Sequence, residues 1–425
     1  MNIRRAACEH APHLALVTAH FGPLGGMERF ARFLVNTTLT AGWHVTVALS
    51  GKNIFEESAS RFGDRLTVEP VGWLEDTSRG DREYAPRRIL ERRRWFRRVR
   101  PDAALFVQSF NTPFRASVAG AALAGIPIVT THRTMAYPVP NVPSRRHLFG
   151  LLPGMGLHRH RTVFKTWLTS ALASRVVYNS QQVREAYEQQ YRYAARKGVV
   201  IPNAATPPAA ECEPAGDHPA GAVTIGYLGR LHASKCVDVL LRATAALRQR
   251  HNVRLLIYGE GPKREELAAL AAQLDLGGLI EWGGHVEDVW PVYQRCDIVA
   301  LCSRQESEAS SNMIVEAMSM GKPVVVTRSG GLEELVEYGQ AGLVVEPNDV
   351  DGLTEALEQL VASPQKRTAL GAQAREIARR LHDPAVAGRA WLAVLDGIIA
   401  REKKAWQGFD NGITILPAGP REAVH

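Results

Sequence analysis

The stretch CSRQESEASSNMIVEAMSMGKPVVVT, residues 302–327, decides the fold. It follows a short apolar run at 298–301 that is typical of a buried strand, and it continues as a polar loop and a helical pattern over about 312–320. Gly321, directly after that pattern, is a usual helix stop, and residues 324–327 predict a further strand. The stretch therefore predicts one strand–loop–helix–strand unit of a parallel α/β sheet.

Two carboxylates flank the start of the predicted helix. Glu308 lies in the loop and Glu316 inside the helix, and the candidate caps between them are Ser310, Ser311 and Asn312. Because the first-turn N–H groups of a helix bind anions, this arrangement suits a ligand in which a sugar, a diphosphate and a ribose are joined. On spacing alone, a solvated or ion-paired Glu316 in an ordinary helix is the more common explanation.

The length and composition indicate a soluble protein of several domains. With 425 residues, the chain exceeds one ordinary core and predicts two or three domains. No apolar run reaches the ~18 residues of a spanning helix, and the apolar run near the N-terminus leads into a glycine-rich loop, which favours a first strand over a signal peptide. Five cysteines without a C-x-x-C motif predict neither a disulfide framework nor a zinc site, and they fit a cytoplasmic location.

Charge is distributed unevenly along the chain. Residues 1–205 contain 29 basic and 14 acidic side chains, whereas the remaining residues contain 22 basic and 29 acidic ones. The first half is therefore expected to face an anionic partner, namely a membrane, a nucleic acid or an acidic acceptor. Its Arg-rich run 87–100 includes Trp95 and Phe96. This run is either a basic helix lying on an anionic membrane or a helix packed through its aromatic stripe, with a solvated basic face.

Apolar runs of strand length alternate with helical patterns in two successive series. The first comprises runs at 13–19, 44–49, 66–71, 103–107, 128–131, 176–178 and 199–201, and the second comprises runs at 223–228, 253–258, 279–282, 298–301, 323–327 and 342–345. This alternation predicts two Rossmann-like, doubly wound α/β domains with ligands at the carboxyl ends of their strands. The Pro- and Ala-rich segment 204–221 predicts the linker, which places the domains at 1–205 and 206–382 with a loose tail at 404–425.

Two loops after predicted strands have features of phosphate sites. Gly25 and Gly26 precede a helix, and glycine lets a backbone approach a phosphate closely. Gly229, Arg230 and Lys235 follow the first strand of the second series, where two cations in one loop suit a diphosphate and a leaving group. Taken singly, each loop is more commonly an ordinary turn or carries a solvated cation.

The remaining candidate residues have weaker signals. His132 ends a strand of the first domain, where a lone histidine is more often structural than catalytic. Gly261 and Val286 follow two strands of the second domain, but a complete G-x-G-x-x-G motif is absent. Asp349 and Asp351 form a D-x-D pattern at a helix start, so we interpret them as N-terminal helix acids and predict no metal and no cofactor.

The segment ESEASSNMIVEAMSMGKPVVVT, together with SGGLEELVEYGQAGLVVEPND at 329–349, resembles the E-x7-E region of the family 4 retaining glycosyltransferases. Residues 25–28 and 229–235 are similar to two further motifs of that family. The resemblance covers most of the chain and implies the GT-B fold, with two Rossmann-like domains facing a cleft and a last helix, about 384–403, that crosses back onto the first domain. Closure of the domains would exclude water and limit hydrolysis of the donor.

The resemblance also implies an activity and roles for individual residues. The activity is transfer of a sugar, with retention, from a nucleotide-sugar co-substrate to a saccharide or lipid-linked acceptor in cell-surface polysaccharide or glycolipid synthesis. The implied catalytic residues are His132, Arg230, Lys235 and Glu308, and the implied donor-binding residues are Gly25, Gly26, Gly229, Gly261, Val286, Ser311, Asn312, Met313 and Glu316. Arg230 and Lys235 would neutralise the departing phosphate, Glu316 would hold the ribose, and Glu308 would contact the donor sugar.

Three positions depart from the family pattern. Cys236 stands where glycine is usual, so the loop either does not need a positive φ or has a different geometry. Residues 108–110 stand where many members have histidine, and Ala309 replaces a common glycine, which would narrow the sugar pocket. The donor base, the sugar, the acceptor and the oligomeric state do not follow from the sequence.

Two other classes of protein fit parts of the sequence. A nicotinamide-dependent oxidoreductase with two Rossmann domains would need the missing G-x-G-x-x-G motif and a following acid. A basic nucleic-acid-binding protein would need an aromatic-interleaved recognition module, and the Arg-rich run is short. We therefore expect a cytoplasmic glycosyltransferase without a nucleic-acid partner, associated peripherally with an anionic membrane surface.

Overall fold

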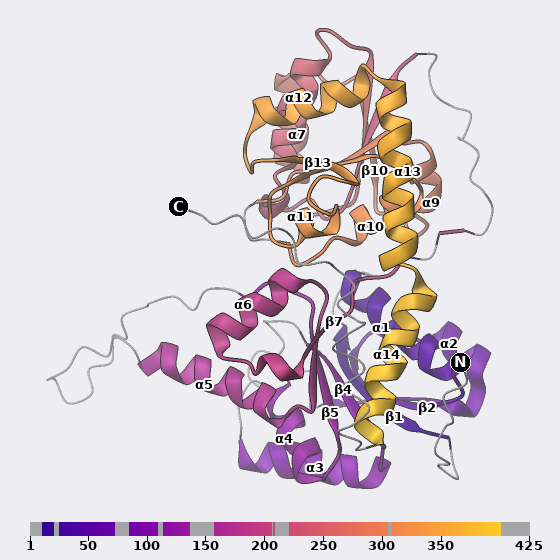
Figure 1. The fold of residues 1–425 in the computed structure, drawn as a ribbon, viewed down its shortest axis with the longest axis vertical. Coiled ribbons are helices and arrows are strands. Elements are labelled where there is room, and N and C mark those ends of the chain that lie inside the picture. Colours follow the sequence, from indigo (N-terminus) through magenta and orange to yellow (C-terminus); the bar gives the residue numbers. More distant parts are fainter. Residues whose placement is uncertain are drawn as a thin grey trace, which may run out of the picture. The chain divides into compact units, whose positions relative to one another are not determined.

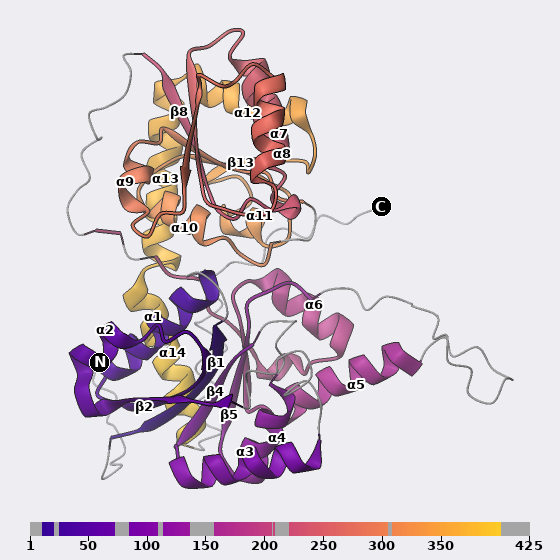
Figure 2. The same cartoon turned by 180° about the vertical axis from the view of Figure 1, so that it is seen from behind.

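The computed structural model describes residues 11–20, 25–72, 85–108, 114–136, 157–205, 207–208, 221–304 and 308–400. The chain forms two compact units, drawn in two opposite views in Figures 1 and 2. The first unit extends to Ile201 and includes the chain again from Gly388, whereas the second extends from Pro202 to Ala387. Most of the predicted linker, the predicted tail and residues 109–110 lie outside the described ranges. No helix within those ranges is long and apolar enough to cross a membrane.

Among the described residues of the first unit, seven parallel strands form one sheet in the order β3-β2-β1-β4-β5-β6-β7. The strands are β1 (His13–His20), β2 (His44–Gly51), β3 (Leu66–Pro70), β4 (Ala103–Gln108), β5 (Ile128–His132), β6 (Arg175–Tyr178) and β7 (Gly198–Val200). The helices are α1 (Gly26–Thr40), α2 (Glu56–Phe62), α3 (Pro86–Val99), α4 (Arg115–Leu123), α5 (Leu157–Leu172) and α6 (Gln181–Tyr191). Residues 14–17 of β1 are fully buried, as expected for a strand with neighbours on both sides.

The last helix, α14 (Pro384–Ile399), packs in the first unit from Gly388 onward. Its Trp391 is buried, and the ring centroids of Trp391 and Phe30 of α1 are 5.4 Å apart. A Cβ on Gly388 would lie 3.1 Å from a methyl carbon of Thr37, so the two helices approach closely here. Figure 1 shows α14 in yellow alongside α1.

The Arg-rich run forms α3, and its two aromatic side chains belong to the core of the first unit. Phe96 is completely buried and Trp95 is 7% exposed. The ring centroids of Phe96 and Phe106 of β4 are 6.2 Å apart, and the indole N–H of Trp95 donates to Glu69 Oε2 at 2.8 Å. The structure therefore favours the packed helix over insertion of these rings into a membrane, because the rings are already covered by protein.

Among the described residues of the second unit, six parallel strands form a sheet in the order β10-β9-β8-β11-β12-β13. The strands are β8 (Val223–Leu228), β9 (Val253–Tyr258), β10 (Ile280–Gly284), β11 (Ile298–Leu301), β12 (Val324–Thr327) and β13 (Gly342–Val345). The helices are α7 (Val237–Leu247), α8 (Arg264–Gln273), α9 (Trp290–Gln294), α10 (Asn312–Ser319), α11 (Leu332–Leu335), α12 (Val350–Val361) and α13 (Pro364–Leu381). The chain runs outward from β8 to β10 and then returns to β11, so the strand order reverses between β8 and β11.

The predicted fold class is confirmed, and every predicted strand is present with ends that shift by at most two residues. Apolar runs locate these strands well because helices cover both faces of a parallel sheet, so almost every strand side chain is apolar. The interpretation of Asp349 is also confirmed. It caps α12, with its Oδ1 accepting from the N–H of Gly352 at 2.9 Å.

Candidate functional site

The reversal of strand order between β8 and β11 makes the carboxyl end of the second sheet the candidate binding site. In open parallel sheets, the loops on either side of such a reversal diverge and leave room for a ligand. Here these loops follow β8 (residues 229–236) and β11 (residues 302–311), and they contain five of the predicted site residues, namely Gly229, Arg230, Lys235, Glu308 and Ser311. The N–H of Arg304 donates to the carbonyl of Ser234 at 2.8 Å and joins the two loops.

Lys235 and Glu308 form an ion pair across this reversal, although they lie far apart in the sequence. The carboxylate of Glu308 is 7% exposed and also accepts a hydrogen bond from the hydroxyl of Ser303 at 2.6 Å. Arg230 is exposed in the loop that contains Lys235, and its carbonyl accepts from the hydroxyl of Tyr227 at 3.0 Å. The loop after β8 therefore presents one paired and one exposed cation beside a buried carboxylate.

The loop after β12 holds the backbone of Glu308 in place. The N–H of Gly331 donates to the Glu308 carbonyl at 2.8 Å. Gly330 has φ +51°, and a Cβ there would lie only 1.8 Å from the same carbonyl oxygen. The hydroxyl of Thr327, at the end of β12, donates to the carbonyl of Ser303 at 2.7 Å. Three adjacent loops thus fix the position of this carboxylate.

Helix α10 begins directly after Glu308, as the sequence predicts. Ser311 is its N-cap, and the Ser311 hydroxyl accepts from the N–H of Ile314 at 3.4 Å. The sulfur of Met313 accepts from the N–H of Leu228 at 3.3 Å, which fixes the first turn against the end of β8. The N-terminus of α10, with the partial positive charge of its N–H groups, is therefore held at the end of β8, the strand whose following loop contains Arg230 and Lys235.

Glu316, one turn into α10, is buried and anchored by a residue outside the motif. Its Oε2 lies 2.9 Å from the hydroxyl of Tyr293 in α9, and Tyr293 is completely buried. The same hydroxyl lies 3.1 Å from the carbonyl of Met313. This contact orients the carboxylate, so the solvated-glutamate explanation does not describe Glu316.

Cys236 adopts the left-handed conformation that favours glycine, with φ 46° and ψ 45°. The loop therefore does need a positive φ, and cysteine supplies it at a conformational cost of about 1 kcal/mol. The side chain is 4% exposed, so its packing offsets part of that cost. Burial also raises the pKa of its thiol, which is a structural rather than a reactive environment.

Gly229 and Gly261 lie where the loops after β8 and β9 pack backbone against backbone. The N–H of Leu231 donates to the carbonyl of Glu260 at 2.8 Å. A Cβ on Gly261 would lie 2.3 Å from the Leu231 carbonyl oxygen, so the close approach itself requires glycine there. Val286 follows β10 at the same end of the sheet and is half-buried. Contact of these residues with a nucleotide stays a prediction.

The candidate residues of the first unit lie after β1 and at the end of β5. Gly25 precedes α1, where its N–H donates to the carboxylate of Glu28 at 3.0 Å, and Gly26 is exposed. His132 ends β5 and is 4% exposed, and its ring packs against Tyr187 with centroids 4.2 Å apart. Burial lowers the pKa of His132 to about 3, so its imidazole is neutral. A contact between His132 and a donor sugar stays a prediction.

Two buried histidines make the stability of the chain depend on pH. Burial lowers the pKa of His132, in the first unit, to about 3 and that of His382, in the second, to about 4. Both values lie below the ordinary 6.5, so the unfolded chain binds more protons than the folded chain once the pH falls below that value. We expect the free energy of unfolding to decrease, as the pH falls from 6.5 towards 5, by up to about 1.4 kcal/mol per pH unit for each histidine.

Urea denaturation at about pH 6.5 and about pH 5 measures this decrease. Carboxylates with lowered pKa values contribute little in that window. Glu281, for example, titrates only near pH 2 because Arg295 hydrogen-bonds its charged form. Equal free energies of unfolding at the two pH values would contradict the neutral, buried state of both histidines.

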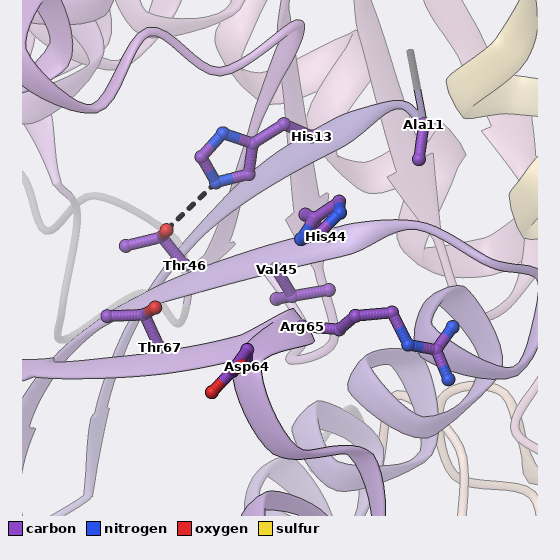
Figure 3. Close-up of a pocket in the computed structure, with 8 residues that line it drawn as sticks. All are labelled: Ala11, His13, His44, Val45, Thr46, Asp64, Arg65 and Thr67. Atoms are coloured by element: carbon purple, nitrogen blue, oxygen red, sulfur yellow. Dashed lines mark hydrogen bonds between the residues drawn. The ribbon is translucent and has the colours of Figure 1, made fainter.

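A cavity of about 360 Å³ lies at the opposite end of the first sheet, near the starts of its first three strands (Figure 3). Its lining comprises Ala11, His13, His44, Val45, Thr46, Asp64, Arg65 and Thr67. Figure 3 shows His13 turned towards Thr46, and His13 Nε2 lies 2.8 Å from the Thr46 hydroxyl. None of the predicted site residues lines this cavity. Ligands of open α/β sheets bind at carboxyl ends, so the cavity is not the candidate active site.

Sequence reasoning missed several residues that support the site. Tyr293 and Ser303 have no local signal, because each acts on a carboxylate that the fold brings to it. Gly330 lies in the quoted S-G-G segment, but only the 1.8 Å approach to Glu308 reveals its role. Asn203, whose side-chain N–H donates to Asn312 Oδ1 at 2.7 Å, lies at the start of the second unit.

Known protein families match both halves of the chain. Residues 24–207 match the family described as Glycosyltransferase Family 4, and residues 222–363 match Glycosyl transferases group 1. The lipopolysaccharide core biosynthesis glycosyltransferase LpsE of Rhizobium meliloti is 33% identical over 160 residues, which cover 38% of this chain and 46% of that protein. The chain thus spans about half the length of the curated relatives that it matches.

Solved structures resemble the chain over nearly its whole length. A glycosyltransferase from Rickettsia africae has a TM-score of 0.73 at 17% identity, covering 92% of this chain and 100% of that one. HepE of Anabaena in complex with UDP and glucose has a TM-score of 0.65 at 20% identity, covering 90% of this chain and 98% of that one. At these identities the likeness establishes the fold alone. From the family matches and the two parallel sheets together, the chain belongs to the group 1 and family 4 glycosyltransferases and has their GT-B fold.

Proposed function

We propose that this protein transfers a sugar from a nucleotide-sugar donor to a saccharide or lipid-linked acceptor, with retention at the anomeric carbon. The observation that carries the proposal is the convergence of Arg230, Lys235, Glu308 and Glu316 at the strand-order reversal of the second sheet. Two cations and a helix N-terminus are suited to binding a diphosphate. Two buried carboxylates are suited to accepting hydrogen bonds from the hydroxyl groups of the sugar and the ribose on either side of that diphosphate.

The ion pair between Lys235 and Glu308 defines how the site would act on a donor. An ammonium group has three N–H donors, so Lys235 contacts Glu308 and keeps donors for phosphate oxygens. Arg230 adds a charge that is exposed before the donor binds. As the bond between the anomeric carbon and the phosphate breaks, both cations stabilise the charge on the leaving group.

The acceptor reaction follows from that leaving group. The acceptor oxygen forms its bond to the anomeric carbon on the face from which the phosphate departs, and its proton passes to a phosphate oxygen. Glu316 would hold the ribose hydroxyls, Glu308 would contact the sugar, and Gly229, Gly261, Val286, Ser311, Asn312 and Met313 would surround the nucleotide. In the first unit, Gly25, Gly26 and His132 are the residues that the family resemblance assigns to the donor.

The names of the relatives support the proposal that the acceptor belongs to cell-surface glycan synthesis. The name of LpsE places that relative in lipopolysaccharide core synthesis, and HepE binds UDP and glucose. We infer an acceptor in cell-surface polysaccharide or glycolipid synthesis, reached from the cytoplasmic side of a membrane.

A donor screen with the full chain tests this function. UDP-, GDP- and ADP-sugars are incubated with the protein, and mass spectrometry detects the released nucleoside diphosphate and the transferred or hydrolysed sugar. We expect turnover of one donor class, and thermal stabilisation by the corresponding nucleoside diphosphate. Stabilisation by NADH together with no turnover of any sugar nucleotide would instead support the oxidoreductase.

The exposed arginines of α3 support a second proposal, that the first unit docks on an anionic membrane by electrostatic attraction alone. Arg92 is buried and Arg98 pairs with Glu69, so neither is a good probe of docking. Arg87, Arg94 and Arg97 are exposed. Since each basic residue near an anionic surface contributes about 1 kcal/mol, replacing these three with glutamine should weaken binding by about 10²-fold.

Co-sedimentation with phosphatidylglycerol vesicles at low and raised salt measures this effect. The control carries the same loss of charge elsewhere in the first unit, through replacement of the exposed Lys52, Arg192 and Arg196 with glutamine, and should bind like the wild type. Equal binding by both triple variants, or wild-type binding that does not respond to salt, would exclude α3 as the docking surface.

A further inference from the structure

Asn203 lies in the segment by which the chain passes from the first unit into the second. It is 9% exposed, and its side-chain amide donates to Asn312 Oδ1 at 2.7 Å. Asn312 is the first residue of α10, the helix whose N-terminus lies in the proposed donor site. A residue at the chain crossing therefore touches the first turn of the helix expected to bind the donor diphosphate.

The other chain crossing is tied to the same residue. The ring Nδ1–H of His382 donates to the carbonyl of Asn203 at 2.7 Å, and the N–H of Ala205 donates to the carbonyl of His382 at 3.1 Å. His382 is 3% exposed and ends α13, a few residues before the chain returns to the first unit at Gly388. Residues 203–205 and His382 thus form a clamp, closed by two hydrogen bonds of opposite direction.

Helix α13 also holds the far end of α10. Arg375 of α13 donates to the carbonyl of Met320 at 3.0 Å, and a Cβ on Gly371 would lie 2.2 Å from the carbonyl oxygen of Gly321. Helix α13 therefore fixes the C-terminus of α10 directly. It also acts on the N-terminus of α10 indirectly, because His382 at the end of α13 hydrogen-bonds to Asn203, and Asn203 hydrogen-bonds to Asn312. Movement of the first turn of α10 has to be accompanied by movement of the clamp.

The contact also determines which atoms Asn312 offers to a ligand. The side-chain carbonyl oxygen of Asn312 accepts from Asn203, which leaves the two N–H groups of its amide as the part available for a ligand. Donors suit phosphate oxygens, whereas an outward carbonyl would repel them. The orientation imposed by Asn203 thus matches the charge expected of the ligand.

We propose that Asn203 is a positioning residue that turns the Asn312 amide towards the donor diphosphate and couples occupancy of that site to the clamp at the chain crossings. The proposal rests on the proposed glycosyl transfer, because it assumes a nucleoside diphosphate at the N-terminus of α10. Coupling is reciprocal, so a ligand that fixes Asn312 also stabilises the clamp.

Asn203→Asp tests the orientation, because aspartate has the same shape but only accepts hydrogen bonds. Asn312 must then donate to residue 203 and present its carbonyl to the phosphates. Calorimetry with the full-length chain compares UDP and GDP with uridine and guanosine. We expect the affinity of the variant for the bound diphosphate to fall by about tenfold or more, and that for the matching nucleoside to change by less than about threefold.

Hydrogen exchange of the wild type tests the coupling without any substitution. Binding of the diphosphate should slow exchange at the Ala205 N–H, which donates to His382, whereas the nucleoside should have little effect. The matched control is Asn252→Asp, which makes the same chemical change at an exposed position of the second unit and should bind like the wild type.

The possible outcomes separate this proposal from the proposed function. A wild type that binds UDP or GDP while Asn203→Asp binds it equally well would overturn only the role of Asn203. Equal losses for diphosphate and nucleoside would reduce Asn203 to a structural residue and also overturn the proposal. A wild type that binds neither nucleoside diphosphate would remove the proposed function and this inference with it.

Discussion

Replacing Arg230 or Lys235 with alanine should lower the rate of sugar transfer by about 10²-fold or more, because in the proposed mechanism each side chain is a preorganised charge that stabilises the departing diphosphate. The two variants should differ in stability. Arg230 is exposed, so its loss should leave the free energy of unfolding almost unchanged. Loss of Lys235 leaves the buried Glu308 carboxylate without its cation, and should destabilise the protein by about 1–3 kcal/mol.

Steady-state kinetics and urea denaturation of each variant separate the two effects. Arg379→Ala is the matched control, since Arg379 forms a more exposed pair with Glu376 along α13. It should retain both rate and stability, as surface pairs contribute little. Normal turnover in both Arg230→Ala and Lys235→Ala would remove these residues from the chemistry, whatever their effect on stability.

The second large effect is expected from Gly330→Ala. A methyl group at this position would lie 1.8 Å from the Glu308 carbonyl oxygen, and the residue has φ +51°. The loop after β12 therefore has to move away from Glu308, and the carboxylate loses the backbone support that would hold it against the donor in the proposed mechanism. We expect activity to fall by about 10²-fold, because misplacement of a catalytic group by about 1 Å has an effect of that size.

Gly125→Ala isolates the contribution of the backbone conformation. Gly125 lies just after the end of α4 and also has a positive φ, +77°, but no atom lies within 4 Å of a Cβ built there. Both variants incur the conformational cost of about 1 kcal/mol, and only Gly330→Ala meets a backbone atom. Similar activity and similar thermal stability of the two variants would show that the close approach to Glu308 has no functional consequence.

Much of the fold was predictable from local sequence. The strands could be predicted from apolar runs, since a parallel strand covered by helices on both faces consists almost entirely of apolar residues. The end of α10 could be predicted from Gly321. This glycine has φ +69°, the left-handed conformation that commonly ends a helix. Of the candidate site, the loop with Arg230 and Lys235 and the helix with Glu316 were identified because their residues lie close together in the chain.

The role of the Arg-rich run was not predictable in the same way. A stripe of aromatic residues on a helix has the same period whether it faces a core or a membrane. Only the position of α3 against β4 shows that Phe96 packs against Phe106 and that Trp95 is bound to Glu69. Arg92 is buried as well, so the exposed arginines of the run are fewer than the sequence suggests.

The sequence by itself determined the two α/β series, the order of their strands along the chain and the residue types of the candidate site. Only the tertiary structure decided how those residues pair. Lys235 meets Glu308 because β8 and β11 become neighbours in the sheet, and Glu316 meets Tyr293 because α9 packs against α10. Local patterns report which face of an element is buried, whereas the partner of a buried charge depends on which strands lie side by side, and that is settled by packing of the whole sheet.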